Sequence, residues 1–286
     1  MDLRKFGIKH RTIHHIQELY LTRSGLVLKD NDVNNFEHVI DSLKSKTIIW
    51  DRLIFNIIEN KKNEESLRNL LTQHNLNYTI KEFSESPYVA PPSSFNKTLE
   101  KLDKKFRYNI TSRIKKLEKE GPIKCKIYSS PEESEEFLEK AYQIERSSWK
   151  ETAGTSITTN DYQQRFYDSF TKLGAENNWL RGIIISVNDE PIAYRYGLLF
   201  NNVFESLKIS YVDKRKKYGP GNILMLETLK FLAQNNITHL DLSGSVEPAK
   251  MKWTKHTYTQ KRVTIFNRNV KGRILYLAEK TRAKYS

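Results

Sequence analysis

Apolar residues recur along this chain with two spacings, which predict an alternation of β-strands and amphipathic helices. Near the start, the run IIWDRLIFNII at 48–58 predicts a strand, and residues 77–83 predict another. Between them, the leucines of 63–75 repeat at helical spacing, so this region predicts a β-α-β unit. The Pro-rich stretch SPYVAPPSS at 86–94 follows, and it is the best candidate for a domain boundary.

A strongly basic amphipathic helix, or two helices in succession, is predicted after this boundary. An apolar stripe runs through 95–117, and Gly121-Pro122 ends the pattern. The opposite face carries the cations Lys97, Lys101, Lys104, Lys105, Arg107, Arg113, Lys115, Lys116 and Lys119. Such a helix suits an anionic partner, while its stripe is also what packing on a core requires.

The rest of the chain predicts two helices, an antiparallel meander of three strands, and then alternating helices and strands. In order, these are a strand at 123–130, helices at 131–149 and 158–174, strands at 179–188, 191–200 and 203–212, an apolar helix from 220, a strand at 239–243, a short helix at 248–254, a strand at 258–267 and a basic C-terminal helix. Short Asn-Asp and Asn-Asn connections within the meander are typical of hairpins.

Composition narrows the class of partner without deciding it. The formal net charge of +14 favours nucleotides, nucleic acid or an acidic membrane surface. Cys125 is the only cysteine, so neither an intrachain disulfide nor a cysteine metal cluster is predicted. His10, His14 and His15 have no carboxylate or cysteine at ligand spacing, and we predict no metal site. No apolar run is long enough to span a membrane, so we expect a cytoplasmic protein, with a peripheral position at the inner face of the membrane as an option.

The turn Lys-Lys-Tyr-Gly-Pro-Gly at 216–221 joins the meander to the apolar helix. Its glycines have neither the spacing and Gly-Lys-Ser/Thr ending of a P-loop nor the third glycine of a Rossmann loop. The first amides of the helix are still available to an anion, and Gly219 and Gly221 let the backbone approach a ligand closely. The alternative is a tight turn that needs glycine only for its dihedral angles.

This order of elements, with a glycine turn after the meander, resembles the GNAT acyltransferases. Their pyrophosphate loop reads Arg/Gln-x-x-Gly-x-Gly/Ala, and Lys216 stands in its first position here. Segments such as ERSSWKE, DEPIAYRYGLL and YGPGNILMLETL also resemble, in order and spacing, the CelD-type (BioF2-like) acetyltransferases associated with polysaccharide biosynthesis.

The CelD-type resemblance covers roughly residues 50–260, and its most specific piece is the run from Asp241 to Trp253. Ala249 departs from that family, which usually has an aromatic residue at this position. The CelD-type proteins are related to the Fem-type aminoacyl transferases, which use two GNAT-like domains and an aminoacyl-tRNA donor.

The resemblance implies an α/β GNAT acyltransferase fold, with a mixed, mostly antiparallel sheet flanked by helices. It divides the chain into a reduced GNAT-like unit at 1–89 and a complete GNAT domain at 90–286. The implied activity is acyl-CoA-dependent N-acyltransfer, with acetyl-CoA as the donor. The implied acceptor is an amino sugar in surface-polysaccharide or cell-envelope biosynthesis.

Particular residues acquire roles from the same resemblance. The pyrophosphate would be bound by Lys216, Lys217, Gly219, Gly221 and Asn222, with Lys214 and Arg215 adding charge. Asp241 is the first candidate for the general base, since it faces away from its apolar neighbours on the strand, and Glu205 and Glu247 compete with it. The candidates for acceptor binding are Arg107, Trp149, Lys150 and Lys250. Each side chain also has a structural explanation, as a paired acid, a core tryptophan or a surface cation.

Three alternatives stay open at this point. The donor could be an aminoacyl-tRNA or an acyl carrier protein, and the net charge and the basic helix suit both. The third alternative is a non-catalytic module that binds RNA or an anionic membrane. Its RNA form is disfavoured because the aromatic residues do not alternate with the cations as stacking platforms would.

Overall fold

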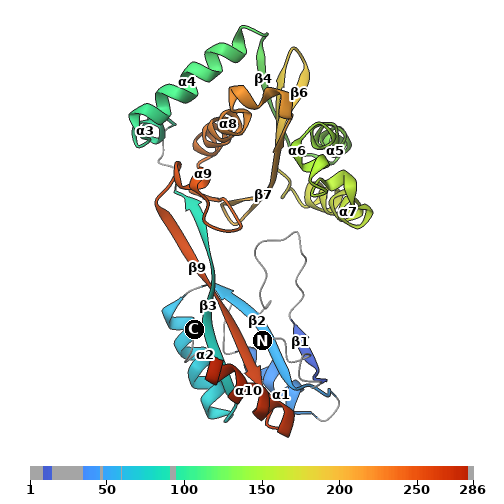
Figure 1. Cartoon of the computed structure of the whole chain (residues 1–286), viewed down its shortest axis with the longest axis vertical. Helices are drawn as coiled ribbons and strands as arrows, with labels where there is room; N and C mark the ends of the chain where they lie inside the picture. The colour runs from blue at the N-terminus through green and yellow to red at the C-terminus, as the bar shows by residue number, and fades with distance from the viewer. Residues whose placement is uncertain (1–8, 15–34, 46–47, 59, 91–94, 283–286) are drawn as a thin grey trace. The chain divides into compact units, whose positions relative to one another are not determined.

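The computed structural model describes residues 9–14, 35–45, 48–58, 60–90 and 95–282 (Figure 1). The chain divides into two compact units, one of residues 1–85 with 258–286 and the other of residues 86–257. His15, Pro91 and Pro92, which figured in the sequence predictions, lie outside the described residues.

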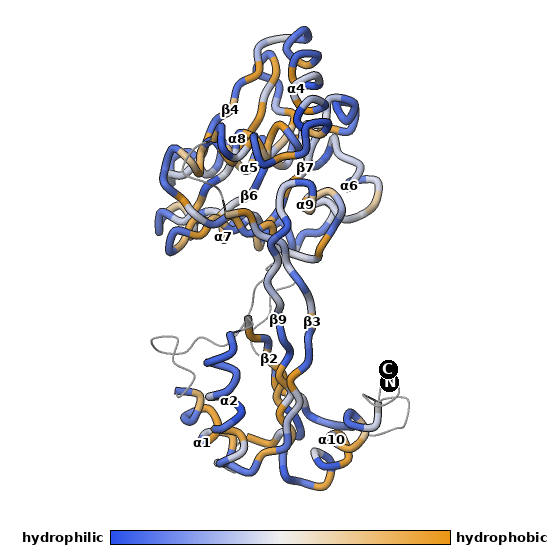
Figure 2. The backbone as a smooth tube through the Cα atoms, turned by 90° about the vertical axis from the view of Figure 1, so that its left-hand side faces the viewer, coloured by the Kyte–Doolittle hydropathy of each residue, from blue (hydrophilic) through white to orange (hydrophobic). Residues whose placement is uncertain are grey.

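The first unit joins the N-terminal β-α-β segment to the end of the chain. Its elements are β1 (Thr12–His14), α1 (Phe36–Lys44), β2 (Arg52–Ile58), α2 (Lys61–Gln73), most of β3 (Asn77–Val89), most of β9 (His256–Phe266) and α10 (Val270–Arg282). β1 pairs with β2 in parallel, and β2 pairs with β9 in the antiparallel sense. Leu53, Leu71 and Val263 are buried in the core beneath α1 and α2, and α10 lies on the other side of the strands (Figure 2).

The second unit contains the meander and most of the helices. Its elements are α3 (Phe95–Glu100), α4 (Lys104–Glu118), β4 (Ile123–Tyr128), α5 (Pro131–Arg146), α6 (Trp149–Thr152), the 3₁₀ helix η4 (Ile157–Thr159), α7 (Asp161–Glu176), β5 (Gly182–Val187), β6 (Glu190–Phe200), β7 (Val203–Tyr211), the 3₁₀ helix η5 (Asp213–Tyr218), α8 (Pro220–Gln234), β8 (His239–Asp241) and α9 (Pro248–Met251). Its strands follow the order β3-β8-β7-β6-β5-β4, and all neighbours are antiparallel except the pair β7 and β8.

Two apolar cores cover the two faces of this sheet. On one face, α8 packs on Phe204 and Leu240, and α3 and α4 cover α8 (Figure 1). α8 is apolar almost all round because it lies between the sheet and these helices. On the other face, α5 and α7 pack on Tyr194 and Tyr196 of β6. Side chains along β6 and β7 alternate between these two faces, except where the register shifts near Tyr196 and Gly197.

The prediction of a mixed, mostly antiparallel sheet flanked by helices is confirmed. The structure changes one sequence-based prediction, for residues 86–89, and decides another, for the number of helices in the basic stretch. Residues 86–89 are the end of β3 rather than a connection, since Tyr88 and Val89 pair with β8. The basic stretch forms two helices because Asp103 caps α4, its Oδ1 accepting a hydrogen bond from Phe106 N at 2.9 Å.

The segment 258–286 differs from the expectation in its grouping. We assigned it from the sequence to the domain 90–286, and it belongs to the first compact unit. The reason is strand pairing, because β9 pairs with β2 from Arg52↔Phe266 to Ile58↔Gln260. The division into a reduced GNAT-like domain at 1–89 and a complete GNAT domain at 90–286 stays a prediction, and the compact units are grouped differently.

Gly197 on β6 is required by packing, so Gly197→Ala should destabilise the fold. A Cβ at this position would lie 2.2 Å from Phe204 Cζ and 2.9 Å from Arg181 O. Overpacking of this kind costs about 1–3 kcal/mol, so equilibrium unfolding should show a lower urea midpoint. Gly221→Ala is the control, because a Cβ there meets nothing within 4 Å. An equal loss of stability in the two variants would contradict the packing argument.

Candidate active site

The strands β7 and β8 separate at Glu205 and Asp241. Their parallel pairing runs only from Val203↔His239 to Glu205↔Asp241, where β8 ends, whereas β7 continues to Tyr211. Within the described residues, no strand pairs with 206–211 on the side of β8. The parallel strands end at the same edge, and α8, which connects them, begins there. Ligand sites of α/β sheets commonly form at the carboxyl ends of such strands.

The two glycines of the turn have different physical reasons. Gly219 has φ +63°, and a Cβ on it would approach an Arg113 guanidinium nitrogen to 2.8 Å, so the backbone and its packing require glycine. Gly221 lies in the first turn of α8, and the space beyond it is open to 4 Å. Neither conformation nor packing requires glycine at 221. The tight-turn explanation therefore accounts for Gly219 and leaves Gly221 unexplained.

The amides at the start of α8 are unequally available. Gly219 N donates to Lys216 O at 3.0 Å, and Asn222 N donates to Gly219 O at 2.9 Å. Pro220 has no N–H. Of the three predicted amide donors, Gly221 N is the one left for an anion at the positive end of the helix.

The cations of η5 are mostly engaged by two glutamates. Lys214 Nζ lies 3.0 Å from Glu190, and Lys217 Nζ lies 4.0 Å from Glu120. Arg215 pairs with both glutamates. Lys216 is exposed and has no ion pair within the described part of the chain. It is thus the cation of this group that stays available to a ligand.

Of the three candidate bases, Asp241 and Glu205 lie side by side, because they are register partners on the same face. Asp241 is fully buried, and its Oδ1 accepts a hydrogen bond from Ser243 N at 2.7 Å, which supports the turn after β8. Glu205 is half-buried. Glu247 is exposed at the start of α9 and pairs with Lys250 at 3.3 Å. The structure thus brings two of the three carboxylates together.

Lys250 holds the loop after β8. Its Nζ donates to Ser243 O at 2.7 Å and to Ser245 O at 3.2 Å. Ser243 and Gly244 both have positive φ, so this loop needs an external tie. These contacts give the Glu-Pro-x-Lys sequence a structural reason.

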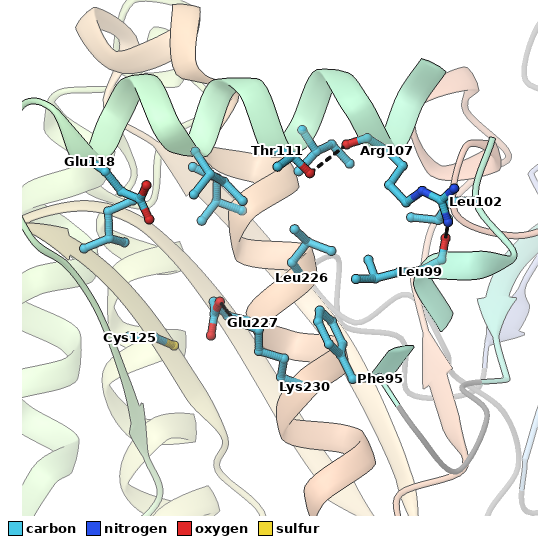
Figure 3. Close-up of a pocket in the computed structure, with 14 residues that line it drawn as sticks. Phe95, Leu99, Leu102, Arg107, Thr111, Glu118, Cys125, Leu226, Glu227 and Lys230 are labelled. Atoms are coloured by element: carbon cyan, nitrogen blue, oxygen red, sulfur yellow. Dashed lines mark hydrogen bonds and ion pairs between the residues drawn. The ribbon is translucent and has the colours of Figure 1, made fainter. Parts of the chain in front are cut away.

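Arg107 and Trp149 lie in different surroundings. Arg107 lines a pocket of about 490 Å³ between α3, α4, α8 and β4, and a nitrogen of its guanidinium donates to Leu99 O at 3.3 Å (Figure 3). Trp149 begins α6 on the face of α5 and α7, and its side chain is 50% exposed. It is therefore a surface aromatic residue rather than a core tryptophan.

A buried polar cluster on this second face escaped the sequence analysis. Glu145 is fully buried, and its two carboxylate oxygens accept hydrogen bonds from Tyr194 Oη at 2.7 Å and from Ile157 N at 3.0 Å. Lys150 Nζ and Lys208 Nζ lie 3.9 Å and 4.0 Å from this carboxylate. Only Lys150 was a candidate. Glu145 and Lys208 lie 63 positions apart in ordinary sequence contexts, and no motif links them.

Burial shifts the proton equilibria of this cluster. It lowers the pKa of Lys208 to about 8, against the opposing effect of the Glu145 carboxylate. It also lowers the pKa of Lys150. Burial and the neighbouring Glu145 raise the pKa of Tyr194 well above its ordinary value, so its hydroxyl stays protonated and donates to the carboxylate.

The described residues contain no group of three or more His, Cys, Asp or Glu side chains that could hold a metal ion. None of the helices in the same residues is both long and apolar enough to cross a membrane.

Comparisons with known proteins agree with this architecture. Residues 104–251, just over half of the chain, match the acetyltransferase (GNAT) domain family. A conserved protein of unknown function from Bacteroides thetaiotaomicron has a similar structure, with a TM-score of 0.59 and 13% identity over 82% of this chain and 75% of that chain. The structure of FemX is also similar, with a TM-score of 0.58 and 10% identity over 86% of this chain and 79% of that chain. L-PGS from Bacillus licheniformis has a TM-score of 0.56 and 14% identity over 88% of this chain and 78% of that chain. No curated protein matches.

Since the family match covers more than half of the sequence, the chain belongs to the acetyltransferase (GNAT) domain family, and it is a transferase. These three solved structures are each below 25% identical to this chain, so their likeness shows the fold alone.

The lowered pKa of Lys208 predicts a pH dependence of stability. Between about pH 8 and the ordinary value of 10.5, the unfolded chain binds more protons at this lysine than the folded chain does, so stability rises with pH over that window. Urea unfolding at pH 7 to 10 should show wild type gaining stability relative to Lys208→Gln as pH increases. Lys124→Gln, at an exposed lysine that pairs with Asp189, is the control. Parallel pH profiles for wild type and Lys208→Gln would exclude a shifted Lys208.

Proposed function

We propose that the protein transfers an acetyl group from acetyl-CoA to the amine of a sugar, in the assembly of a surface polysaccharide or of the cell envelope. The choice of acetyl-CoA as the donor is supported by the open space beyond Gly221 at the start of α8. This helix start follows β7, whose pairing with β8 ends at Glu205. The acceptor class rests on the resemblance to the CelD-type acetyltransferases.

The residues at this edge suit the parts of such a reaction. The Gly221 amide and Lys216 would bind the pyrophosphate, and the amides of β7 beyond Glu205 would hold the pantetheine chain and the thioester carbonyl. The amine nitrogen attacks the thioester carbon, the new C–N bond replaces the C–S bond, and coenzyme A leaves as a thiolate. The proton of the amine passes to Asp241 or Glu205, which lie together on the sheet.

The acceptor would approach from the face of α5 and α7. Trp149 is half-exposed there, which suits stacking on a sugar ring, and Lys150 follows it. On the other face, the exposed cations of α4, among them Lys104, Lys105 and Lys115, favour a position near an anionic membrane surface inside the cell. Such a position would bring the enzyme to envelope intermediates.

The same basic helix would also suit an aminoacyl-tRNA donor, and the structural likeness to FemX keeps this second candidate in view. The two donors differ in what the helix start must hold. The pyrophosphate of coenzyme A would fill the open space beyond Gly221. A tRNA donor would leave that open space unexplained. Acetyl-CoA binding therefore separates the two candidates.

Gly221→Glu should abolish acetyl-CoA binding without unfolding the protein. A side chain fits at 221 because nothing lies within 4 Å of its Cβ, but a carboxylate there would occupy and repel the pyrophosphate site. Titration calorimetry with acetyl-CoA measures binding, and circular dichroism checks the fold. Gly221→Ala, which adds a methyl group without charge, should retain most of the affinity.

Unchanged binding by folded Gly221→Glu would place the donor elsewhere. No acetyl-CoA binding by the wild type would favour the aminoacyl-tRNA donor.

Asp241→Asn should lower turnover by about 10²–10⁴-fold with nearly unchanged acetyl-CoA affinity, if Asp241 accepts the amine proton. The asparagine Oδ1 can still accept the hydrogen bond from Ser243 N, so the turn after β8 is retained. Thiol release in the presence of amino-sugar acceptors measures turnover. Glu205→Gln is the matched variant on the neighbouring strand. If Asp241→Asn retains full turnover and only Glu205→Gln loses it, Glu205 is the base.

A further inference from the structure

Lys150 and Lys208 form a buried pair of cations that share one carboxylate. Their side chains are 18% and 11% exposed, and Glu145 between them is fully buried. Within the described residues, Glu145 is the acid that forms ion pairs with either lysine. Two ammonium groups and one carboxylate leave an excess of one positive charge. Buried charges are normally compensated, so the cluster lacks one negative group.

The hydrogen bonds of the cluster show the same deficit. Both Glu145 oxygens accept from Tyr194 and Ile157, and at 3.9 Å and 4.0 Å the ammonium groups stand beyond hydrogen-bond distance. Lys150 Nζ donates instead to Ile209 O, and Lys208 Nζ donates to Thr155 O at 3.3 Å.

Gln163 can occupy one more donor of Lys208. When its amide nitrogen donates to Ser156 O, the amide oxygen lies 3.2 Å from Lys208 Nζ. Each ammonium has three N–H donors. Two remain on Lys150 and one on Lys208 for a further acceptor.

Ser210 is an independent sign of a ligand at the same place. It is 4% exposed, and its hydroxyl has no hydrogen-bond partner among the described residues. It follows Ile209, whose carbonyl accepts from Lys150, and it pairs in register with Tyr194, so it lies on the face of the lysines. Buried hydroxyl groups are rarely left without a partner.

The position of the cluster connects it to the reacting edge. Lys208, Ile209 and Ser210 belong to the part of β7 that continues beyond β8. Trp149, which precedes Lys150 at the start of α6, is 50% exposed, so an accessible aromatic residue adjoins the cluster in sequence. A group bound by the lysines would hold an acceptor beside this edge.

We propose that Lys150, Lys208 and Ser210 form an oxyanion subsite that binds a phosphate or carboxylate of the acceptor. The inference rests on the proposed N-acyltransfer and specifies its substrate class as an amino sugar that carries an acidic group. The oxyanion supplies the missing negative charge and accepts hydrogen bonds from both ammonium groups and from the serine hydroxyl.

The subsite makes binding dependent on pH in one direction. Since burial lowers the pKa of Lys208 to about 8, affinity for the acidic acceptor should fall above that pH. The other groups that face it are Glu145 on α5, Lys150 on α6, Tyr167 on α7 and Tyr194 on β6. The pKa of Tyr194 is raised, so it adds no competing charge there.

The test compares three probes at physiological ionic strength by titration calorimetry in the presence of coenzyme A. Glucosamine has no acidic group, glucosamine 6-phosphate carries a phosphate, and muramic acid carries a carboxylate. Wild type should bind at least one acidic probe about tenfold or more tightly than glucosamine, since hydrogen bonds to a charged group are stronger than those between neutral groups. Whichever acidic probe binds more tightly identifies the oxyanion.

Lys150→Gln and Lys208→Gln should each remove this preference while acetyl-CoA affinity stays at the wild-type value. Lys124→Gln, an exposed lysine on β4, removes the same charge and should change neither quantity. Wild-type protein also provides a test that needs no variant. With ¹³Cε-labelled lysine, NMR titration should show the pKa of Lys208 rising from about 8 when inorganic phosphate is added.

Equal affinity of wild type for all three probes, or a Lys208 pKa unmoved by phosphate, would overturn the subsite. Because acetyl-CoA binding is measured separately, failure of the proposed function would appear as a wild type that binds no acetyl-CoA. If wild type binds acetyl-CoA but binds all three probes equally well, only the subsite proposal is contradicted and the proposed function stands.

Discussion

The short parallel pairing of β7 with β8 is the contact on which the arrangement of the second unit depends. It consists of three register pairs, yet it fixes where α8 begins and which part of β7 has no strand partner on the β8 side within the described residues. Phe204 and Leu240 anchor it, because both are fully buried against α8. Beyond these residues β8 must stop, since Ser243 and Gly244 turn the chain with positive φ.

Three polar contacts hold that turn from different elements. Asp241 Oδ1 accepts from Ser243 N, Ser86 Oγ of β3 donates to Gly244 O at 2.7 Å, and Lys250 of α9 donates to Ser243 O. Asp241 therefore has a structural role in this turn, and the proposed proton-accepting role would be additional to it. Asparagine at 241 would separate the two, because its Oδ1 can still accept the hydrogen bond from Ser243 N.

Much of this fold could be predicted from local sequence patterns. The features that could not be predicted are those that depend on strand pairing and register. The meander, the apolar helix and the glycine turn follow from periodicity and turn residues. The grouping of β9 with β2 joins residues about 200 positions apart, which periodicity does not report. The cluster around Glu145 depends on a register shift between β6 and β7 near Tyr196 and Gly197. Sequence alternation alone cannot assign Lys208 to a face across such a shift.

The two glycines of the turn show how structure separates two meanings of one motif. Gly219 is explained by its own dihedral angle and by Arg113, so its presence says nothing about a ligand. Gly221 is helical and has open space beyond it, and a helix normally disfavours glycine by roughly 0.5–1 kcal/mol relative to alanine. The same reasoning applies to Ser210, whose buried hydroxyl also carries an uncompensated cost. Ser210 lies near the carboxyl end of β7 and Gly221 at the start of α8, which follows β7 and η5, and the proposed acceptor and donor would account for one residue each.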